Sequence, residues 1–274
     1  MYGLLAIAFS LIYRSTRAIN FAQGHLALLG AYVALWAISG LKLPYLLSCS
    51  IGVVAVIAIS VLIEMVAFRP LYRFGTVLVI VSSIALTFVL ETIVQLIWGA
   101  QSLRLPPLVG GNFSIGAVVV SWQQVAIICS LVVMVVVLQL LLRTRIGRAM
   151  RATAENPDVA SLVGIRSRFM ISFSFGFAGL LTGIAGILVA PLTYLEPSGG
   201  GSLGLLGIVA AIVGGLGNIF GAVAGGMIIG FVHVTGAYLA GGSFVEILTF
   251  AVLVLVLLVR PQGIFGEEGT KVRA

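Results

Sequence analysis

Charged residues are scarce in this chain, and their scarcity excludes an ordinary water-soluble fold. Only 8% of the 274 residues are charged, whereas 61% are hydrophobic and the mean hydropathy is +1.23. A soluble domain carries about a quarter charged residues, because its surface faces water. A surface that faces lipid has no such need, since the bilayer interior is itself apolar. The composition therefore predicts an integral membrane protein with little room for a soluble domain.

The residues of several familiar kinds of site are missing as well. Cys49 and Cys129 are too far apart for a metal-binding motif, so we interpret them as buried structural thiols and expect no metal. There is no Gly-x-x-x-x-Gly-Lys-Ser/Thr loop to hold nucleotide phosphates, so we expect the chain itself to bind no ATP or other cofactor. We found no paired catalytic carboxylates and no nucleophile beside a base, which argues against a membrane-embedded enzyme.

Long apolar runs provide the membrane crossings. A helix needs about 20 mainly apolar residues to span a bilayer. The predicted spans are residues 22–38, 45–67, 77–97, 119–142, 169–190, 203–217, 222–239 and 244–259. Residues 2–13 make only about half a span, so we expect an upstream part of that helix to be missing from this chain. We thus predict an all-α integral membrane protein, one domain over residues 1–274, with a polytopic bundle of about 8–9 transmembrane helices.

Basic residues are concentrated on one side of this bundle. Cytoplasmic loops of membrane proteins are enriched in Lys and Arg. If residues 2–13 form a crossing, one side holds 13 basic residues and the other holds only Lys42 and Arg104. The thirteen are Arg14, Arg17, Arg69, Arg73, Arg143, Arg145, Arg148, Arg151, Arg166, Arg168, Arg260, Lys271 and Arg273. We therefore predict a cytoplasmic C-terminus. Because these residues are not interleaved with aromatics on a soluble face, we expect the lipid bilayer, and no nucleic acid, as their partner.

A polar break interrupts the apolar sequence near the N-terminus. Residues 18–25 include Asn20, Phe21, Gln23, Gly24 and His25, which place three polar side chains and a glycine between two apolar runs. A backbone break is tolerated inside a membrane only where it is buried in protein or lines a watery cavity. Two interpretations are open. The segment is either a short cytoplasmic turn or an intramembrane break, and in the second case these five residues line the translocation path.

Few ionisable residues fall inside the predicted spans. Such a residue costs at least about 2.5 kcal/mol at the bilayer centre and is therefore a functional candidate. Glu91 lies deep in the span 77–97 and is either a structural hydrogen-bonding residue or a further residue of the translocation path. Glu64 lies near a cytoplasmic end, within reach of Arg69 or Arg73, and we interpret it as structural. A proton-coupled carrier is expected to show a chain of such groups, so their scarcity disfavours a secondary transporter.

One cytoplasmic segment, residues 143–168, is long enough to have structure of its own. It holds six of the fifteen basic residues, and Arg148 and Arg151 share one face if residues 146–155, which end at Glu155, are helical. The segment is either a solvated loop that fixes orientation or a docking surface. Capping signals favour docking, because a mere tether needs no defined helices.

These capping signals surround Asn156. The residue before a proline is biased away from helical geometry, so the first helix ends there. Asn156 as N-cap, Pro157 at the first helical position and Asp158 in the first turn together predict the start of a second helix. Gly164 suits its C-terminal cap. We therefore predict two short helices joined at Asn156 and lying outside the membrane.

Four motifs resemble those of the branched-chain amino-acid ABC importer permeases (LivH-like). Residues 18–24 read Ala-Ile-Asn-Phe-Ala-Gln-Gly and resemble the first-helix signature of that family, which usually ends in His-Gly. Residues 67–71 (Ala-Phe-Arg-Pro-Leu), 214–218 (Gly-Gly-Leu-Gly-Asn) and 260–266 (Arg-Pro-Gln-Gly-Ile-Phe-Gly) resemble three further motifs in the expected order. Residues 143–168 also look like the cytoplasmic coupling segment of these permeases.

The resemblance implies a permease subunit of an ABC importer for branched-chain amino acids in a bacterial inner membrane, without an ATPase site of its own. It implies as partners a second homologous permease subunit, two cytoplasmic ATP-binding subunits and a periplasmic amino-acid-binding protein. The implied ATPase-coupling residues are Arg148, Arg151, Glu155, Asn156, Pro157, Ala160, Gly164 and Ile165. Urea or short amides are the nearest alternative substrates, and an ATP-independent carrier or channel is the alternative mechanism.

Overall fold

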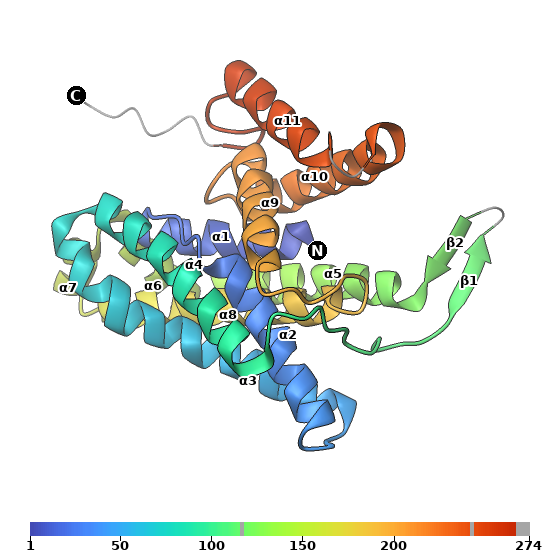
Figure 1. Ribbon diagram of the computed structural model, residues 1–274. Helices are drawn as coiled ribbons and strands as arrows, with labels where there is room; N and C mark the ends of the chain where they lie inside the picture. Colours follow the sequence, from blue (N-terminus) through green and yellow to red (C-terminus); the bar gives the residue numbers. More distant parts are fainter. Residues whose placement is uncertain (116–117, 242–243, 267–274) are drawn as a thin grey trace.

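The chain is almost entirely helical in the computed structural model, which describes residues 1–115, 118–241 and 244–266 (Figure 1). The α-helices are α1 (Tyr2–Thr16), α2 (Gln23–Ser39), α3 (Tyr45–Ile63), α4 (Thr76–Trp98), α5 (Trp122–Arg143), α6 (Arg145–Glu155), α7 (Pro157–Leu162), α8 (Ser167–Val189), α9 (Gly199–Gly214), α10 (Ile219–Ala240) and α11 (Val245–Val259). Strands β1 (Asn112–Ile115) and β2 (Val118–Ser121) form an antiparallel hairpin, the only sheet among the described residues. The all-α prediction is confirmed with that small exception.

Five helices of the described part are long and apolar enough to cross a membrane. They are α4, α5, α8, α10 and the continuous stretch Tyr45–Phe74, in which α3 passes into a π-helical turn and a 3₁₀ turn. Helices α2, α9 and α11 are shorter and apolar, and α1 is a further apolar helix of 15 residues. Together they agree with the predicted bundle of about 8–9 spans. The chain is a multi-pass membrane protein.

Helix α5 begins later than the sequence predicted. The apolar run starts at Val119, but residues up to Ser121 belong to strand β2. Ser121 then caps α5, because its hydroxyl accepts a hydrogen bond from the Gln124 backbone N–H at 3.3 Å and the Gln124 side chain accepts one from the Ser121 N–H at 3.1 Å. The prediction that this span starts at Val119 is therefore wrong, since apolarity alone does not distinguish the valine-rich strand from the helix.

Helix α8 lies at the centre of the bundle and α5 at its edge. Two thirds of the apolar stretch of α8 are buried, 67% against 17% for α5. Helix α8 packs against α1, α2 and α3, and glycines allow the close approach: a Cβ on Gly186 would overlap the backbone of Ala27 in α2. The two cysteines lie farther out, Cys49 half-buried and Cys129 exposed, so our interpretation of both as buried is wrong for Cys129.

The loops predicted to be cytoplasmic lie together at one end of the molecule. Helices α6 and α7 are at that end, and the β-hairpin is at the opposite end (Figure 1). Basic residues from four separate parts of the chain line two hollows there: Arg14, Arg17, Arg143 and Arg151 line one, and Arg69, Arg73, Arg166 and Arg168 line the other. The basic residues that the sequence analysis assigned to one side of the membrane thus also lie together at one end of the folded chain.

Candidate functional site

The polar break between α1 and α2 is buried inside the bundle. Helix α1 ends at Thr16, and Arg17 turns the chain in a left-handed conformation with φ of 56°. Asn20 is 2% exposed, Gln23 is 0% exposed and His25 is 5% exposed. A solvated turn would leave these side chains in water. Their burial favours the interpretation as a break within the bundle.

Hydrogen bonds satisfy two of the three polar side chains of this break, Asn20 and Gln23. The Asn20 Nδ2 donates to Gln23 Oε1 at 3.1 Å, and Asn20 Oδ1 accepts from the Ala22 backbone N–H at 3.1 Å. The Gln23 Nε2 crosses to α8, where it donates to the hydroxyl of Thr182 and to the carbonyl of Ala178. Gln23 thereby joins the start of α2 to the central helix. A buried amide that pairs in this way rigidifies its surroundings.

The backbone of the break is held by α4. The Phe21 N–H donates to the hydroxyl of Ser83 at 3.1 Å, and that hydroxyl donates to the carbonyl of Ile80 at 2.7 Å. The break is therefore supported from two sides, by α8 through Gln23 and by α4 through Ser83. Buried backbone groups outside a helix need such partners, because no water reaches them.

Gly24 brings the backbones of α2 and α9 into direct contact. A Cβ at this position would overlap the carbonyl oxygen of Gly200 and the backbone N–H of Gly204. Gly24 is thus required for packing, and it fixes the first turn of α9 against the polar break.

His25 and Glu91 lie beside each other. The sequence analysis had singled them out separately, as two candidate residues of the translocation path. The His25 Nε2 of α2 is 3.6 Å from the Glu91 Oε2 of α4. The imidazole rests on the first turn of α9, where a Cβ on Gly200 would come within 2.7 Å of the ring, and neither ring nitrogen makes a hydrogen bond within the described residues. The Glu91 side chain is 28% exposed and accepts a hydrogen bond from Gln95 at 3.3 Å. Three helices therefore meet at one ionisable pair.

A polar stripe on α4 escaped the sequence analysis. Ser83, Thr87, Glu91 and Gln95 recur at intervals of four and so share one face of a helix. The stripe runs from the polar break, where Ser83 bonds Phe21, to the side of His25. The four-residue spacing was visible in the sequence. We had singled out Glu91 for its charge alone.

The segment of residues 143–168 has the two helices and the caps that were predicted. The Asn156 Oδ1 accepts hydrogen bonds from the N–H groups of Asp158 and Val159 at 3.0 and 3.1 Å. At the other end of α7, Gly164 has φ of 83°, its N–H donates to the Ser161 carbonyl, and the Ile165 N–H donates to the Ala160 carbonyl, both at 3.1 Å. This is a Schellman motif, which satisfies the last carbonyls of the helix.

The outer face of the segment is exposed and partly apolar. Arg148, Arg151 and Glu155 are exposed on α6, whereas Ala160 is buried on the inner side of α7. Leu162 and Val163 at the end of α7 are 85% and 73% exposed. The sequence analysis missed this apolar tip, because a short helix gives no indication of which of its faces packs inward.

Helix α8 connects α7 to the polar break. The Ser167 hydroxyl at the start of α8 donates to the Pro157 carbonyl of α7 at 2.8 Å. Thr182, on the same helix, holds Gln23. The two positions are about 22 Å apart along a rigid helix. The two groups of candidate residues are thus separate in space but joined by one element.

Two of the four motifs that resemble the permease family, residues 214–218 and 260–266, contact each other. The backbone N–H groups of Ile264 and Phe265 donate to the carbonyls of Val213 and Gly214 at 2.9 and 3.0 Å. The Asn218 side chain donates to the Phe265 carbonyl at 3.0 Å. The C-terminal motif is therefore the partner of the glycine-rich motif between α9 and α10.

Comparison with known proteins covers nearly the whole chain. The high-affinity branched-chain amino acid transport system permease protein BraD of Pseudomonas aeruginosa is 33% identical over 282 residues, which span 97% of this chain and 92% of BraD. The corresponding protein LivH of Escherichia coli K12 is 31% identical, with 97% and 91% covered. A probable branched-chain amino acid transport permease protein LivH of Methanocaldococcus jannaschii is 30% identical, with 98% and 90% covered.

No solved structure matches this chain. Residues 1–257 match the family described as the permease component of branched-chain amino acid transport systems. The sequence resemblance is confirmed, and the chain is a transport component that belongs to this permease family.

Proposed function

We propose that this chain is the membrane-spanning permease subunit of an ABC importer for branched-chain amino acids. The observation that carries the proposal is the sequence identity to BraD and LivH, 33% and 31%, which extends over 97% of this chain. Both relatives are named as permeases for branched-chain amino acid transport. The buried polar break supports it, because irregular polar backbone at membrane depth is typical of the substrate path in transporters. We assign the translocation path to Asn20, Phe21, Gln23, Gly24, His25 and Glu91.

The energy for transport comes from separate subunits. Two cytoplasmic ATP-binding subunits dock on the exposed face of α6 and α7, and a second permease subunit and a periplasmic binding protein complete the importer. The apolar tip of Leu162 and Val163 supports this docking, since neighbouring exposed apolar side chains on a segment outside the membrane are typical of interaction sites. The charge bias supports a cytoplasmic position for this end and for the C-terminus, in a bacterial inner membrane.

The contacts suggest how docking reaches the path. Movement of the ATP-binding subunits shifts α6 and α7, and the Ser167–Pro157 hydrogen bond carries the shift to α8. Helix α8 moves Gln23 through Thr182. The start of α2 then moves relative to α4 and α9, which separates or closes the contact of His25 with Glu91. The path opens alternately to the two sides because a packed contact of this kind has discrete arrangements.

Reconstitution in liposomes tests the function. The chain is combined with its candidate partner subunits, and uptake of labelled leucine is measured with and without ATP and binding protein. We expect uptake that needs both. Uptake without ATP would indicate a carrier or channel, and uptake of urea in place of leucine would overturn the substrate assignment.

Charge reversal tests the docking surface. Arg148→Glu and Glu155→Arg should abolish ATP-driven uptake and association with the ATP-binding subunits, because both side chains are exposed on the docking face. Membrane insertion should be unchanged. Lys42→Glu, an exposed reversal in a loop away from this face, is the matched control and should leave association intact. Unchanged uptake in the α6 variants would contradict the assignment.

Cysteine labelling tests the path. Single cysteines at positions 20, 23 and 25, in a chain without Cys49 and Cys129, should react with a small water-soluble thiol reagent during turnover. Protection of all three positions in every state would exclude them from the path.

A further inference from the structure

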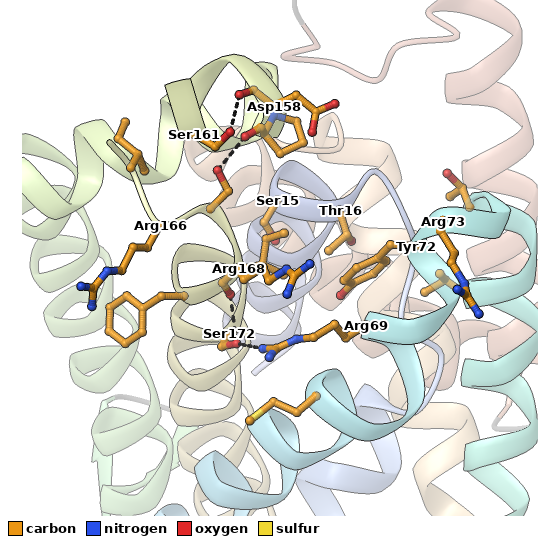
Figure 2. A pocket seen from close by; sticks show the side chains of 18 of the residues that line it. Ser15, Thr16, Arg69, Tyr72, Arg73, Asp158, Ser161, Arg166, Arg168 and Ser172 are labelled. Atoms are coloured by element: carbon orange, nitrogen blue, oxygen red, sulfur yellow. Dashed lines mark hydrogen bonds between the residues drawn. The ribbon is translucent and has the colours of Figure 1, made fainter. Parts of the chain in front are cut away.

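A large cavity lies at the basic end of the bundle, outside the proposed translocation path and bordered on one side by α7. Its volume is about 1270 Å³. It is enclosed by α7, the start of α8, the end of α1 and the turns that follow α3 (Figure 2). Its lining includes Ser15, Thr16, Arg69, Tyr72 and Arg168. The proposed transport mechanism uses Pro157 and Ser167 of its wall, but it assigns no ligand to the cavity.

The lining of the cavity is strongly basic. Four arginines line it, against one acidic residue, Asp158. Arg69 is already paired with Glu64 at 2.8 Å, which leaves an excess of positive charge from the other three. Figure 2 shows Arg69 and Arg168 in the middle of the cavity, with Arg166 and Arg73 on its two sides. Since Arg69 and Arg168 lie nearest the middle, this arrangement favours an anion held between these two side chains.

One polar group in the cavity wall lacks a partner. The hydroxyl of Tyr72 is buried and makes no hydrogen bond within the described residues. A buried hydroxyl of this kind costs free energy unless an acceptor satisfies it. Tyr72 lies close to Arg69 in Figure 2, so an acceptor oxygen bound at the arginines is within the same part of the cavity. The hydroxyl therefore points to a ligand independently of the charge.

The remaining wall is apolar and opens outward. Met65 and Phe169 line the same cavity and are 48% and 59% exposed. Their neighbours Val66 and Phe74 are 68% and 58% exposed. These side chains lie near the ends of two apolar stretches that are long enough to span a membrane, Tyr45–Phe74 and Ser167–Val189. A soluble anion needs no apolar wall, whereas the acyl chains of a lipid do.

We propose that this cavity binds an anionic phospholipid from the leaflet on the basic side of the bundle. The phosphate lies between Arg168 and Arg69 and accepts a hydrogen bond from the Tyr72 hydroxyl, and the acyl chains leave over Met65 and Phe169. Basic clusters at helix ends attract such headgroups. Pro157, Asp158 and Ser161 of α7 also line the cavity, so a bound lipid contacts the coupling segment directly.

Lipid binding to the purified full-length chain tests the proposal. Native mass spectrometry in detergent measures retention of phosphatidylglycerol, and of phosphatidylcholine as a probe with the same phosphate but no net charge. Phosphatidylglycerol should be retained about tenfold more strongly. Arg168→Gln should reduce that retention about fivefold, and Tyr72→Phe, which removes only the hydroxyl, about threefold. Arg145→Gln, an exposed arginine of α6 outside the cavity, is the matched control and should not change it.

Three outcomes would overturn the proposal. Equal retention of the two lipids would show that the net negative charge of the headgroup does not contribute to binding. Retention unaffected by both Arg168→Gln and Tyr72→Phe would place the lipid elsewhere. Displacement of phosphatidylglycerol by inorganic phosphate at equal concentration would identify free phosphate as the ligand, because the acyl chains would then contribute nothing. If Arg168→Gln fails to fold, Tyr72→Phe decides alone, since it keeps the shape of the wall.

Discussion

Two breaks between consecutive helices, α1–α2 and α6–α7, carry candidate functional residues. The polar groups of these two breaks find their hydrogen-bond partners in opposite ways. The break between α1 and α2 is buried, and its polar groups pair partly with distant helices: Gln23 bonds Thr182, 159 residues away along the chain. The break between α6 and α7 is exposed, and its backbone groups are satisfied locally. The Asn156 side chain accepts hydrogen bonds from the N–H groups of Asp158 and Val159, two and three residues further along the chain. The first depends on the tertiary structure, and the second depends on its own sequence.

This difference suits two different tasks. A buried break that other helices hold changes its conformation only when those helices move. A movement of α8 can therefore change the conformation of the break at the translocation path. A locally capped pair of helices keeps its shape while it shifts as a unit, which a docking surface requires. Substitutions in the first should therefore destabilise the whole bundle, and substitutions in the second should affect only α7.

The largest effect is expected at Gly24. In Gly24→Ala the new methyl group would overlap the backbone of Gly200 and Gly204, so α2 and α9 must separate. Overpacking of this kind costs about 3 kcal/mol or more when backbone rather than a flexible side chain is in the way. The thermal midpoint of the purified protein should drop sharply. Gly201→Ala is the control, because its Cβ would lie 4.0 Å from the His25 ring and should be tolerated. Equal midpoints for the two variants would contradict the observed packing.

Gln23 should give the next largest effect. Gln23→Leu keeps a similar volume but leaves the Asn20 amide group and the Thr182 hydroxyl without their partner. Buried polar groups that lose a partner cost about 1–3 kcal/mol. Thermal unfolding should show a loss of about 2 kcal/mol, and uptake should fall with it. Gln101→Leu, at an exposed position between α4 and β1, should change the midpoint little. A stable Gln23→Leu protein would mean that the amide does not hold α2 to α8.

The sequence predicted those parts of the structure that depend on local chemistry. Apolar runs located the spans, because about 20 apolar residues have few uses other than crossing a membrane. Asn156, Pro157 and Gly164 located α7, because caps act within a few residues of themselves. Glu64 was expected to reach Arg69 or Arg73, and it pairs with Arg69, which is only five residues away.

The sequence did not predict the contacts between distant segments. Nothing near Gln23 indicates that its partner is Thr182, and nothing near His25 indicates Glu91. The cavity behind Arg168 is lined from three separate stretches of the chain, within residues 15–16, 61–79 and 157–172, so no single stretch of sequence contains it. Strand β2 was missed for a different reason, because its valines continue the apolar pattern of the helix that follows.

The exposed segment should respond locally. Gly164 has φ of 83°, and a Cβ there would meet no atom within 4 Å. Gly164→Ala therefore adds no clash but forces a side chain into the left-handed region, at a cost of about 1–2 kcal/mol. Hydrogen exchange at the amides of α7 should accelerate, whereas the thermal midpoint of the bundle should stay the same. Gly164→Asn should exchange more slowly than Gly164→Ala, because asparagine tolerates this conformation. A lower midpoint in Gly164→Ala would show that α7 is part of the cooperative bundle.

Asn156 should give the smallest loss of stability. Asn156→Ala removes the acceptor for the Asp158 and Val159 N–H groups, which costs about 1 kcal/mol at an N-cap. Hydrogen exchange in the first turn of α7 should accelerate about fivefold, with no change in the thermal midpoint. Asn156→Asp, which caps equally well, should restore slow exchange. If transport falls in Asn156→Ala and recovers in Asn156→Asp while the midpoint is constant in both, the shape of α7 matters for coupling and not for folding. A fall in the midpoint would instead make this break as dependent on the bundle as the one at Gln23.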